Sequence, residues 1–183
     1  EIYRCDWSSD VCSSDLAGSG DDSIVSNDGN DTIFAGAGND VIRAGAGTDN
    51  IDAGANNDTI YGAQGSDVIQ GNDGTDVLVI DGNYRADSDS NLVGVEKVLV
   101  QDNATPVLVD LSNQNTNEGF TVQLPDRGDT VILSADTLSV MSNDIVIGGN
   151  GNDSIVAGAG TDSVDAGAGD DTVVAGDGDA LLA

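Results

Sequence analysis

Aspartate recurs every nine residues near both ends of this chain, each time within a short stretch of small, turn-forming residues. From Ala17 the sequence divides without gaps into seven nonapeptide repeats, and from Gly148 into four more, the last of them degenerate. The sixth position is Asp in ten of these eleven repeats, and Ala180 is the exception. The eighth position is always Ile, Val or Leu. Such a fixed register is typical of a solenoid and not of a disordered low-complexity linker.

Carboxylates at this spacing, in turns rich in Gly, suit a hard divalent cation. Ca²⁺ takes about six to eight oxygen ligands from carboxylates and backbone carbonyls, and Gly lets a turn curl so that its carbonyls converge. Mg²⁺ is less suited because it demands octahedral geometry. An EF-hand is excluded because no twelve-residue loop ends in Glu, and phosphate binding is disfavoured because the turns lack Lys.

The composition also favours cations as partners. The 183-residue chain has 33 acidic and 5 basic residues and a net charge of −28. This charge opposes compaction unless it is neutralised, and it makes nucleic acid and anionic membrane surfaces poor partners. No apolar run approaches the roughly 18 residues of a membrane span, so membrane insertion is not expected.

Catalysis is not expected from this chain. It contains no His, its only thiols are Cys5 and Cys12, and no Ser lies in a Gly-x-Ser-x-Gly motif. These absences exclude His-based triads and His-metal centres, so we expect the chain not to be an enzyme.

Residues 1–16, EIYRCDWSSDVCSSDL, resemble nothing later in the chain. The run DWSSDVCSSD resembles the in-frame translation of a common short-read sequencing adapter, so we interpret residues 1–16 as an artefact and set them aside. A disulfide or metal site at Cys5 and Cys12 is the alternative. On the adapter interpretation, the true N-terminus of the parent protein is missing.

Each nonapeptide predicts one turn and one short strand. Positions one to six are small or turn-forming, and positions seven to nine place one aliphatic side chain inward. Two repeats then close an 18-residue coil with two walls, and successive coils stack as parallel sheet around a thin core. The predicted fold is therefore all-β, a parallel β-roll (a calcium-binding β-solenoid) in two repeat blocks joined by a β-rich segment without repeats.

The segment between the blocks loses the nine-residue period but keeps aliphatic, β-branched runs. We expect it to continue or cap the solenoid without calcium, because solenoids need closed ends. A ligand pocket there has no supporting constellation of residues. The predicted strands are 92–100, 106–111, 120–124, 130–134 and 143–149. The predicted organisation is an artefact at 1–16, repeat blocks at 17–79 and 148–183, and a β-rich spacer at 80–147.

The repeat resembles the nonapeptide of the repeats-in-toxin (RTX) family, Gly-Gly-x-Gly-x-Asp-x-aliphatic-x, over residues 17–79 and 148–183. LVGVEKV (92–98) is similar to an element that often follows RTX arrays. Ala often replaces the first Gly; Asn27, Ala63 and Asn72 replace the second, and Asn56 replaces the later Gly of its repeat. The resemblance implies Ca²⁺ as cofactor, shared between the sixth-position Asp of one turn and that of the turn two repeats later.

The implied ligands are the sixth-position carboxylates and the Gly-rich turns. The carboxylates pair as Asp22–Asp40, Asp31–Asp49, Asp40–Asp58, Asp49–Asp67, Asp58–Asp76 and Asp153–Asp171, while Asp162 would pair with the repeat in which Ala180 replaces Asp. The glycines are Gly18, Gly20, Gly36, Gly38, Gly45, Gly47, Gly149, Gly151, Gly158 and Gly160.

Stacked carboxylates repel one another until cations lie between them, so Ca²⁺ binding should drive folding. The resemblance implies a calcium-binding part of a larger secreted bacterial protein, an adhesin or exoprotein. It also implies an extracellular or cell-surface location, export by a type I secretion apparatus and a cell-surface partner of the parent protein. The alternative is a C-terminal secretion and folding module of a secreted hydrolase or toxin. Ice binding ranks last, because no aligned Thr array is present.

Overall fold

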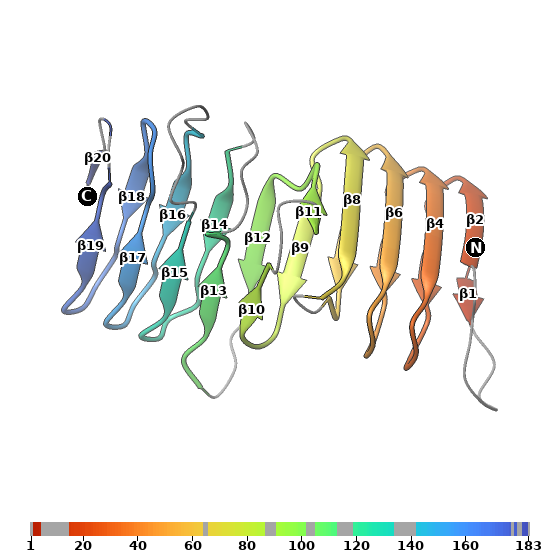
Figure 1. The fold of residues 1–183 in the computed structure, drawn as a ribbon, viewed down its shortest axis with the longest axis horizontal. Coiled ribbons are helices and arrows are strands. Elements are labelled where there is room, and N and C mark those ends of the chain that lie inside the picture. Colours follow the sequence, from red (N-terminus) through yellow and green to blue (C-terminus); the bar gives the residue numbers. More distant parts are fainter. Residues whose placement is uncertain are drawn as a thin grey trace. The chain divides into compact units, whose positions relative to one another are not determined.

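The computed structural model describes residues 2–4, 15–63, 66–86, 91–101, 105–112, 119–133, 142–176, 178 and 181–182, so Cys5 and Cys12 lie outside the described residues. The chain divides into two compact units. Unit 1 is Glu1–Val79 with Ser90–Val95, and unit 2 is Ile80–Asp89 with Glu96–Ala183. The described residues form β-strands and no helix, and the strand pairs in each unit are parallel (Figure 1). The predicted all-β parallel solenoid is confirmed.

Unit 1 is built from two sheets, and successive strands of the repeats alternate between them. Repeat strands that are neighbours in a sheet lie 18 residues apart, as Ile24 opposite Ile42 and Ile33 opposite Ile51 show. The 18-residue coil of two nonapeptides is therefore confirmed. The first sheet has the order β1-β3-β5-β7-β9 (Ile2–Arg4, Ser23–Val25, Val41–Arg43, Thr59–Tyr61, Val77–Ile80). The second has the order β2-β4-β6-β8-β11 (Asp15–Ser19, Thr32–Ala37, Asn50–Ala55, Val68–Asp73, Leu92–Val93).

One wall of unit 1 has longer strands than the repeat predicts. On the first sheet, β3, β5 and β7 are three residues long, as positions seven to nine predict. On the second sheet, β4, β6 and β8 are six residues long. They continue into the first three positions of the next repeat, because the backbone there stays paired between coils, as with Gly36 opposite Gly54.

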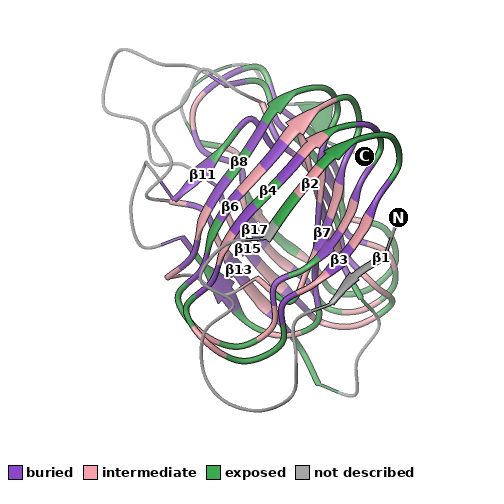
Figure 2. Ribbon diagram, turned by 90° about the vertical axis from the view of Figure 1, so that its right-hand side faces the viewer, coloured by how far each residue is buried: buried purple, intermediate pink, exposed green. Residues whose placement is uncertain are grey.

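The eighth position of the repeat forms the core, as predicted, in nine of the eleven repeats. Ile and Leu at this position are fully buried, and Ala at the first position adds a second buried row (Figure 2). The exceptions are Val173, which is half-buried, and Leu182, which is 54% exposed. They lie on β19 and β20, the last described strands of their sheets. The buried residues are Ile24, Ile33, Ile42, Ile51, Ile60, Ile69, Leu78, Ile155 and Val164, with Ala35, Ala44, Ala53 and Ala157.

Unit 2 is also built from two sheets, and it shows that the spacer strands continue the solenoid. Val98 lies opposite Val122 and Val122 opposite Val146, at 24-residue intervals, whereas Val146 lies opposite Val164 at 18. The extra residues lie in the connections, so the strand register is kept. One sheet has the order β12-β14-β16-β18-β20 (Lys97–Val100, Thr121–Gln123, Ile145–Ile147, Ser163–Asp165, Leu181–Leu182). The other has the order β10-β13-β15-β17-β19 (Tyr84–Arg85, Leu108–Asp110, Thr130–Ile132, Ser154–Val156, Thr172–Val174).

The predicted strands of the spacer are found, with one difference. The runs at 106–111, 120–124, 130–134 and 143–149 contain β13, β14, β15 and β16. The run at 92–100 is two strands, because the chain turns at Gly94, whose φ is +64°. β11 therefore belongs to unit 1 and β12 to unit 2.

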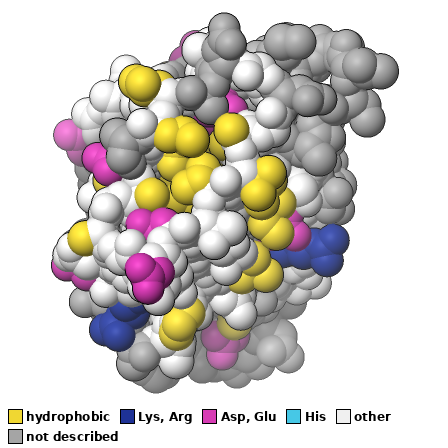
Figure 3. Space-filling model, turned by 90° about the vertical axis from the view of Figure 1, so that its left-hand side faces the viewer, with side chains coloured by type: hydrophobic (Ala, Val, Ile, Leu, Met, Phe, Trp, Pro, Cys, Tyr) yellow, Lys and Arg dark blue, Asp and Glu magenta, His cyan; other side chains and the backbone are white. Residues whose placement is uncertain are grey.

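Hydrophobic side chains gather on the face of unit 2 that carries its last coil (Figure 3). Val174, Leu181 and Leu182 are 52%, 70% and 54% exposed there. Leu182 occupies a strand position that is buried in the coils before it, at Val164 and Val146, whereas the position of Leu181 is also exposed at Ser163. The last described coil of unit 2 therefore leaves one core-type side chain, Leu182, exposed.

Gly in the turns is required both by backbone conformation and by close stacking. All ten glycines predicted to line the turns have positive φ, and so do Asn27, Asn56 and Asn72, which replace Gly. Asn tolerates this region better than most other residues. At Gly47 (φ +154°) a Cβ would also overlap the carbonyl oxygen of Gly29 in the preceding coil. At Gly47 the two coils can therefore stack this closely only in the absence of a side chain.

We predict that Gly47→Ala destabilises the folded chain. Backbone strain alone costs about 1–3 kcal/mol, and the overlap with Gly29 adds to it. Gly82→Ala is the matched control, because a Cβ at Gly82 meets nothing within 4 Å. Urea unfolding with Ca²⁺ present measures both variants. Equal free energies of unfolding for the two would contradict the role given to close stacking.

Candidate metal centre

The sixth-position Asp residues of unit 1 form two stacked ladders. From the second member of each ladder onward, the Oδ1 atom accepts a hydrogen bond from the backbone N–H of the Asp one coil earlier. One edge of the coils carries Asp22, Asp40, Asp58 and Asp76, and the other carries Asp31, Asp49 and Asp67. The N···O distances are 2.8 Å for Asp22–Asp40, 2.7 Å for Asp40–Asp58 and for Asp58–Asp76, and 2.9 Å for Asp31–Asp49 and for Asp49–Asp67. The structure thus brings together the five pairs predicted for this block.

The same arrangement runs through unit 2. Asp153 N donates to Asp171 Oδ1 at 2.9 Å, so the pair predicted there is also brought together. Asp162 accepts from the backbone N–H of Asp144 at 3.1 Å. Its predicted partner repeat is described only in part, because Asp179 and Ala180 lie outside the described residues.

Two members of these ladders, Asp129 and Asp144, escaped the sequence analysis. Asp129 N donates to Asp153 Oδ1 at 2.8 Å, and the Oδ1 atoms of Asp129 and Asp144 accept the N–H groups of Val107 and Phe120, both at 2.7 Å. The sequence did contain a signal for both residues. Asp129-Thr-Val and Asp144-Ile-Val both carry the Asp-x-aliphatic core of the repeat, and Asp144 is in phase with the block at Gly148. Their turns lack the glycine pattern.

Four of the ladder carboxylates have a buried oxygen with nothing to bond. The Oδ2 atoms of Asp40, Asp49, Asp58 and Asp153 are buried and have no hydrogen-bond partner in the structure. A buried charged oxygen without a partner costs several times more than an ordinary hydrogen bond contributes. Each of these carboxylates therefore needs either a proton or a cation.

Burial raises the pKa of all four carboxyl groups. Desolvation is the largest cause in every case, and it raises the pKa of Asp58 from 3.8 to about 7. The backbone hydrogen bond to each carboxylate opposes this rise. Stacked carboxylates add to it: Asp76 and Asp40 raise the pKa of Asp58, and Asp171 and Asp129 raise that of Asp153.

A second ladder, on the exposed side of the turns, is neutral in most of its rungs. The fifth-position side chain accepts a hydrogen bond from the backbone N–H at the same position one coil later. Thr48 N donates to Asn30 Oδ1 at 2.9 Å, and Thr161 N to Asn143 Oδ1 at 2.9 Å. Because these acceptors are exposed and mostly amides, this ladder orders the turns without needing a cation. The other rungs are Asn39–Asp21, Asn57–Asn39, Thr75–Asn57 and Asp170–Asn152.

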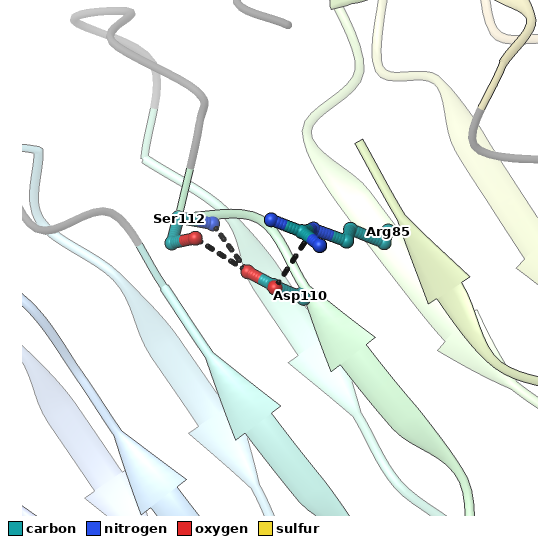
Figure 4. Close-up of polar contacts among 3 residues, drawn as sticks. All are labelled: Arg85, Asp110 and Ser112. Carbon is teal, nitrogen blue, oxygen red and sulfur yellow. Dashed lines mark hydrogen bonds and ion pairs between the residues drawn. The ribbon is translucent and has the colours of Figure 1, made fainter. Parts of the chain in front are cut away.

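Asp110 shows how a carboxylate outside the ladders is satisfied by the protein itself. Its Oδ1 accepts from the backbone N–H and the hydroxyl of Ser112, and its Oδ2 lies 3.3 Å from Arg85 Nε (Figure 4). The Arg85 side chain is 64% exposed, so the ion pair is screened and contributes little to stability. Both carboxylate oxygens are nonetheless occupied, which is not so at Asp40, Asp49, Asp58 and Asp153.

The oxygen atoms along the turns fit Ca²⁺ better than other metals. Carboxylate and carbonyl oxygens are hard ligands, and Ca²⁺ accepts irregular sets of them. Among the described residues, no three Asp, Glu, His or Cys side chains gather as a metal cluster. Backbone carbonyls and water would therefore supply most of the ligands, with the ladder carboxylates supplying the charge.

We predict that the metal-free chain is more stable in acid than at neutral pH. Between pH 3.8 and about 7 the folded chain holds a proton on Asp58 that the unfolded chain has lost. Stability is thus fully present below pH 3.8 and falls as the pH rises through about 7. Circular dichroism from pH 3 to 8 in metal-stripped buffer measures this. Asp58→Asn should flatten the profile, and a metal-free fold that strengthens with rising pH would contradict it.

Comparison with known proteins agrees with this geometry. The chain matches the family model of the RTX calcium-binding nonapeptide repeat (4 copies) at residues 16–51, 43–78 and 147–182. Together these matches cover more than half of the chain and contain all ten sixth-position Asp residues of the repeats. No curated protein and no solved structure matches the chain. The repeats, the parallel coils and the family match together show that this chain belongs to the RTX calcium-binding nonapeptide repeat family.

Proposed function

We propose that this chain is a calcium-dependent folding module, in which Ca²⁺ ions bind between stacked turns and hold the coils together. The observation that carries the proposal is the buried, unpartnered Oδ2 of Asp40, Asp49, Asp58 and Asp153. Family membership implies calcium binding, and these oxygens are places where a cation would remove a specific cost.

The proposed ligands are those that the repeat pattern predicts. The carboxylates are Asp22, Asp31, Asp40, Asp49, Asp58, Asp67, Asp76, Asp153, Asp162 and Asp171. The glycine-rich turns would contribute carbonyl oxygens at Gly18, Gly20, Gly36, Gly38, Gly45, Gly47, Gly149, Gly151, Gly158 and Gly160. Positive φ at all ten glycines supports this assignment, because it allows consecutive carbonyls of one turn to face the same side.

Binding and folding would be a single process. The turns that hold the ligands exist only when the coils are stacked, so the free energy of binding becomes free energy of folding. At a free Ca²⁺ concentration 100 times the dissociation constant, one site adds about 2.7 kcal/mol. Several sites in one cooperative stack would take the chain from unfolded to folded over a narrow range of Ca²⁺.

We further propose that the module belongs to a larger bacterial protein that folds after export into calcium-rich surroundings. RTX repeats occur in secreted proteins, which supports an extracellular location, an adhesin or exoprotein as parent, and export by a type I apparatus. In the described part of the chain, no helix has the length and hydropathy to span a membrane. Sequencing the gene upstream of residue 17 tests the parent. A hydrolase domain there would favour the enzyme-module alternative, and further adhesin-like repeats would favour an adhesin.

We predict that the full chain changes from coil to β-structure when titrated with CaCl₂, that EGTA reverses the change, and that Mg²⁺ has less effect. In Asp40→Ala/Asp49→Ala the transition should need more Ca²⁺ and be less cooperative, because each carboxylate serves two neighbouring coils. Far-UV circular dichroism follows the titration. Asp165→Ala is the control, since Asp165 is exposed on β18. A double variant that titrates like the wild type would argue against these ligands.

A further inference from the structure

The turn that contains Asp129 lies in the spacer, outside the residues that match the repeat family. Asp129 is 1% exposed, and its backbone N–H donates to Asp153 Oδ1 at 2.8 Å. Its own Oδ1 accepts from Val107 N at 2.7 Å. It therefore has the same place in the ladder as Asp153, although 24 residues rather than 18 separate the two.

The backbone of this turn approaches the next coil as a repeat turn does. Between the regular turns, a Cβ added at Gly167 or Gly169 would overlap the carbonyl oxygens of Gly149 and Gly151. One coil earlier, a Cβ at Gly149 would lie 2.8 Å from the carbonyl oxygen of Pro125, and one at Gly151 would overlap that of Arg127. Pro125 and Arg127 thus place carbonyl oxygens against the Asp153 turn where glycines do so in the repeats.

The partner carboxylate in this turn pair is incompletely bonded. Asp153 is 2% exposed, and its Oδ1 takes the Asp129 N–H while its Oδ2 is buried without a hydrogen-bond partner. Asp129 and Asp171 both raise the pKa of Asp153 by Coulombic repulsion, which places negative charge on both sides of it. A cation on the Asp129 side would offset the repulsion between Asp129 and Asp153.

Asp144 is the other spacer member of the ladders, and neither of its carboxylate oxygens lacks a partner. The Ser142 hydroxyl lies 3.3 Å from its Oδ2, and Phe120 N donates to its Oδ1. Both oxygens of Asp144 are therefore engaged by the protein, and we leave it out of the inference.

We infer that a further Ca²⁺ ion binds between the turn at 124–129 and the turn at 148–153, with Asp129 and Asp153 as its carboxylate ligands. The spacer is then part of the calcium-binding array and not a calcium-free connection. This inference rests on the proposed calcium binding of the repeats. It extends the array by one coil beyond the residues that the repeat pattern identifies.

Asp129→Asn in the full chain tests the inference. The amide still accepts the hydrogen bond from Val107 N but carries no charge. We expect loss of about one bound ion, measured by equilibrium dialysis against CaCl₂ with metal analysis, and a higher Ca²⁺ midpoint for folding. Asp165→Asn makes the same charge change at an exposed strand position and should bind as many ions as the wild type. Asp58→Asn should lose ions within the matched repeats.

The outcomes separate the inference from the proposed function. If Asp129→Asn and Asp165→Asn bind equal numbers of ions, and Asp129→Asn is at least as stable as the wild type in saturating Ca²⁺, the inference is overturned while calcium binding by the repeats stands. Without an ion at this site, removing a buried charge beside Asp153 would stabilise the chain. Failure of Asp129→Asn to fold in saturating Ca²⁺, with Asp165→Asn folded, therefore supports the inference. If the wild type binds no Ca²⁺, the proposed function itself fails.

Discussion

The structure depends on one carboxylate in each turn, buried so that it can bond the backbone of the coil before it. The backbone N–H of the sixth position needs an acceptor, which Oδ1 of the next Asp in the stack supplies. The second carboxylate oxygen, Oδ2, is then buried without a hydrogen-bond partner, which is unfavourable. This is the case at Asp40, Asp49, Asp58 and Asp153. The same group both closes the turn and carries the unfavourable charge, and this is the physical basis of the proposed dependence of folding on a proton or a cation.

The apolar core and the exposed hydrogen bonds of the repeats define how the coils stack, but they add little to the free energy of folding. In the repeats the core is one row of Ile, Val or Leu from each wall, with Ala beside it, so each repeat coil buries few apolar atoms. The exposed ladder of fifth-position Asn and Asp side chains fixes the coil spacing through ordinary hydrogen bonds. These contacts favour a single register, and in the proposed function cations offset the charge of the inner ladder. This division explains how a chain with a net charge of −28 can have one defined compact state.

The spacer shows how much variation the solenoid accepts. Its coils are longer, yet Val98, Val122 and Val146 stay in line, because the inward side chain and the parallel pairing are preserved while the connections absorb the extra residues. The ladder also continues, through Asp129 and Asp144. The glycine pattern is therefore not what defines a coil. An inward aliphatic residue and parallel pairing keep the stack in register even where Glu96 and Phe120 replace the preceding Asp. Where that Asp is present, the protein can satisfy it in more than one way, as Ser142 does for Asp144.

The nine-residue period predicted the parallel solenoid, the 18-residue coil and the inward row at position eight, because one turn and one short strand per repeat place every aliphatic side chain on the same side of its wall. The pairs of stacked Asp residues followed from the resemblance to the repeat family. The Asp-x-aliphatic signal at Asp129 and Asp144 was in the sequence, but the changed coil length and the missing glycines made it easy to overlook. The six-residue strands of one wall could not be predicted, because they depend on pairing between coils. The sequence also could not show which Asp oxygens lack partners. That is decided by burial, and burial exists only once neighbouring coils cover the turn.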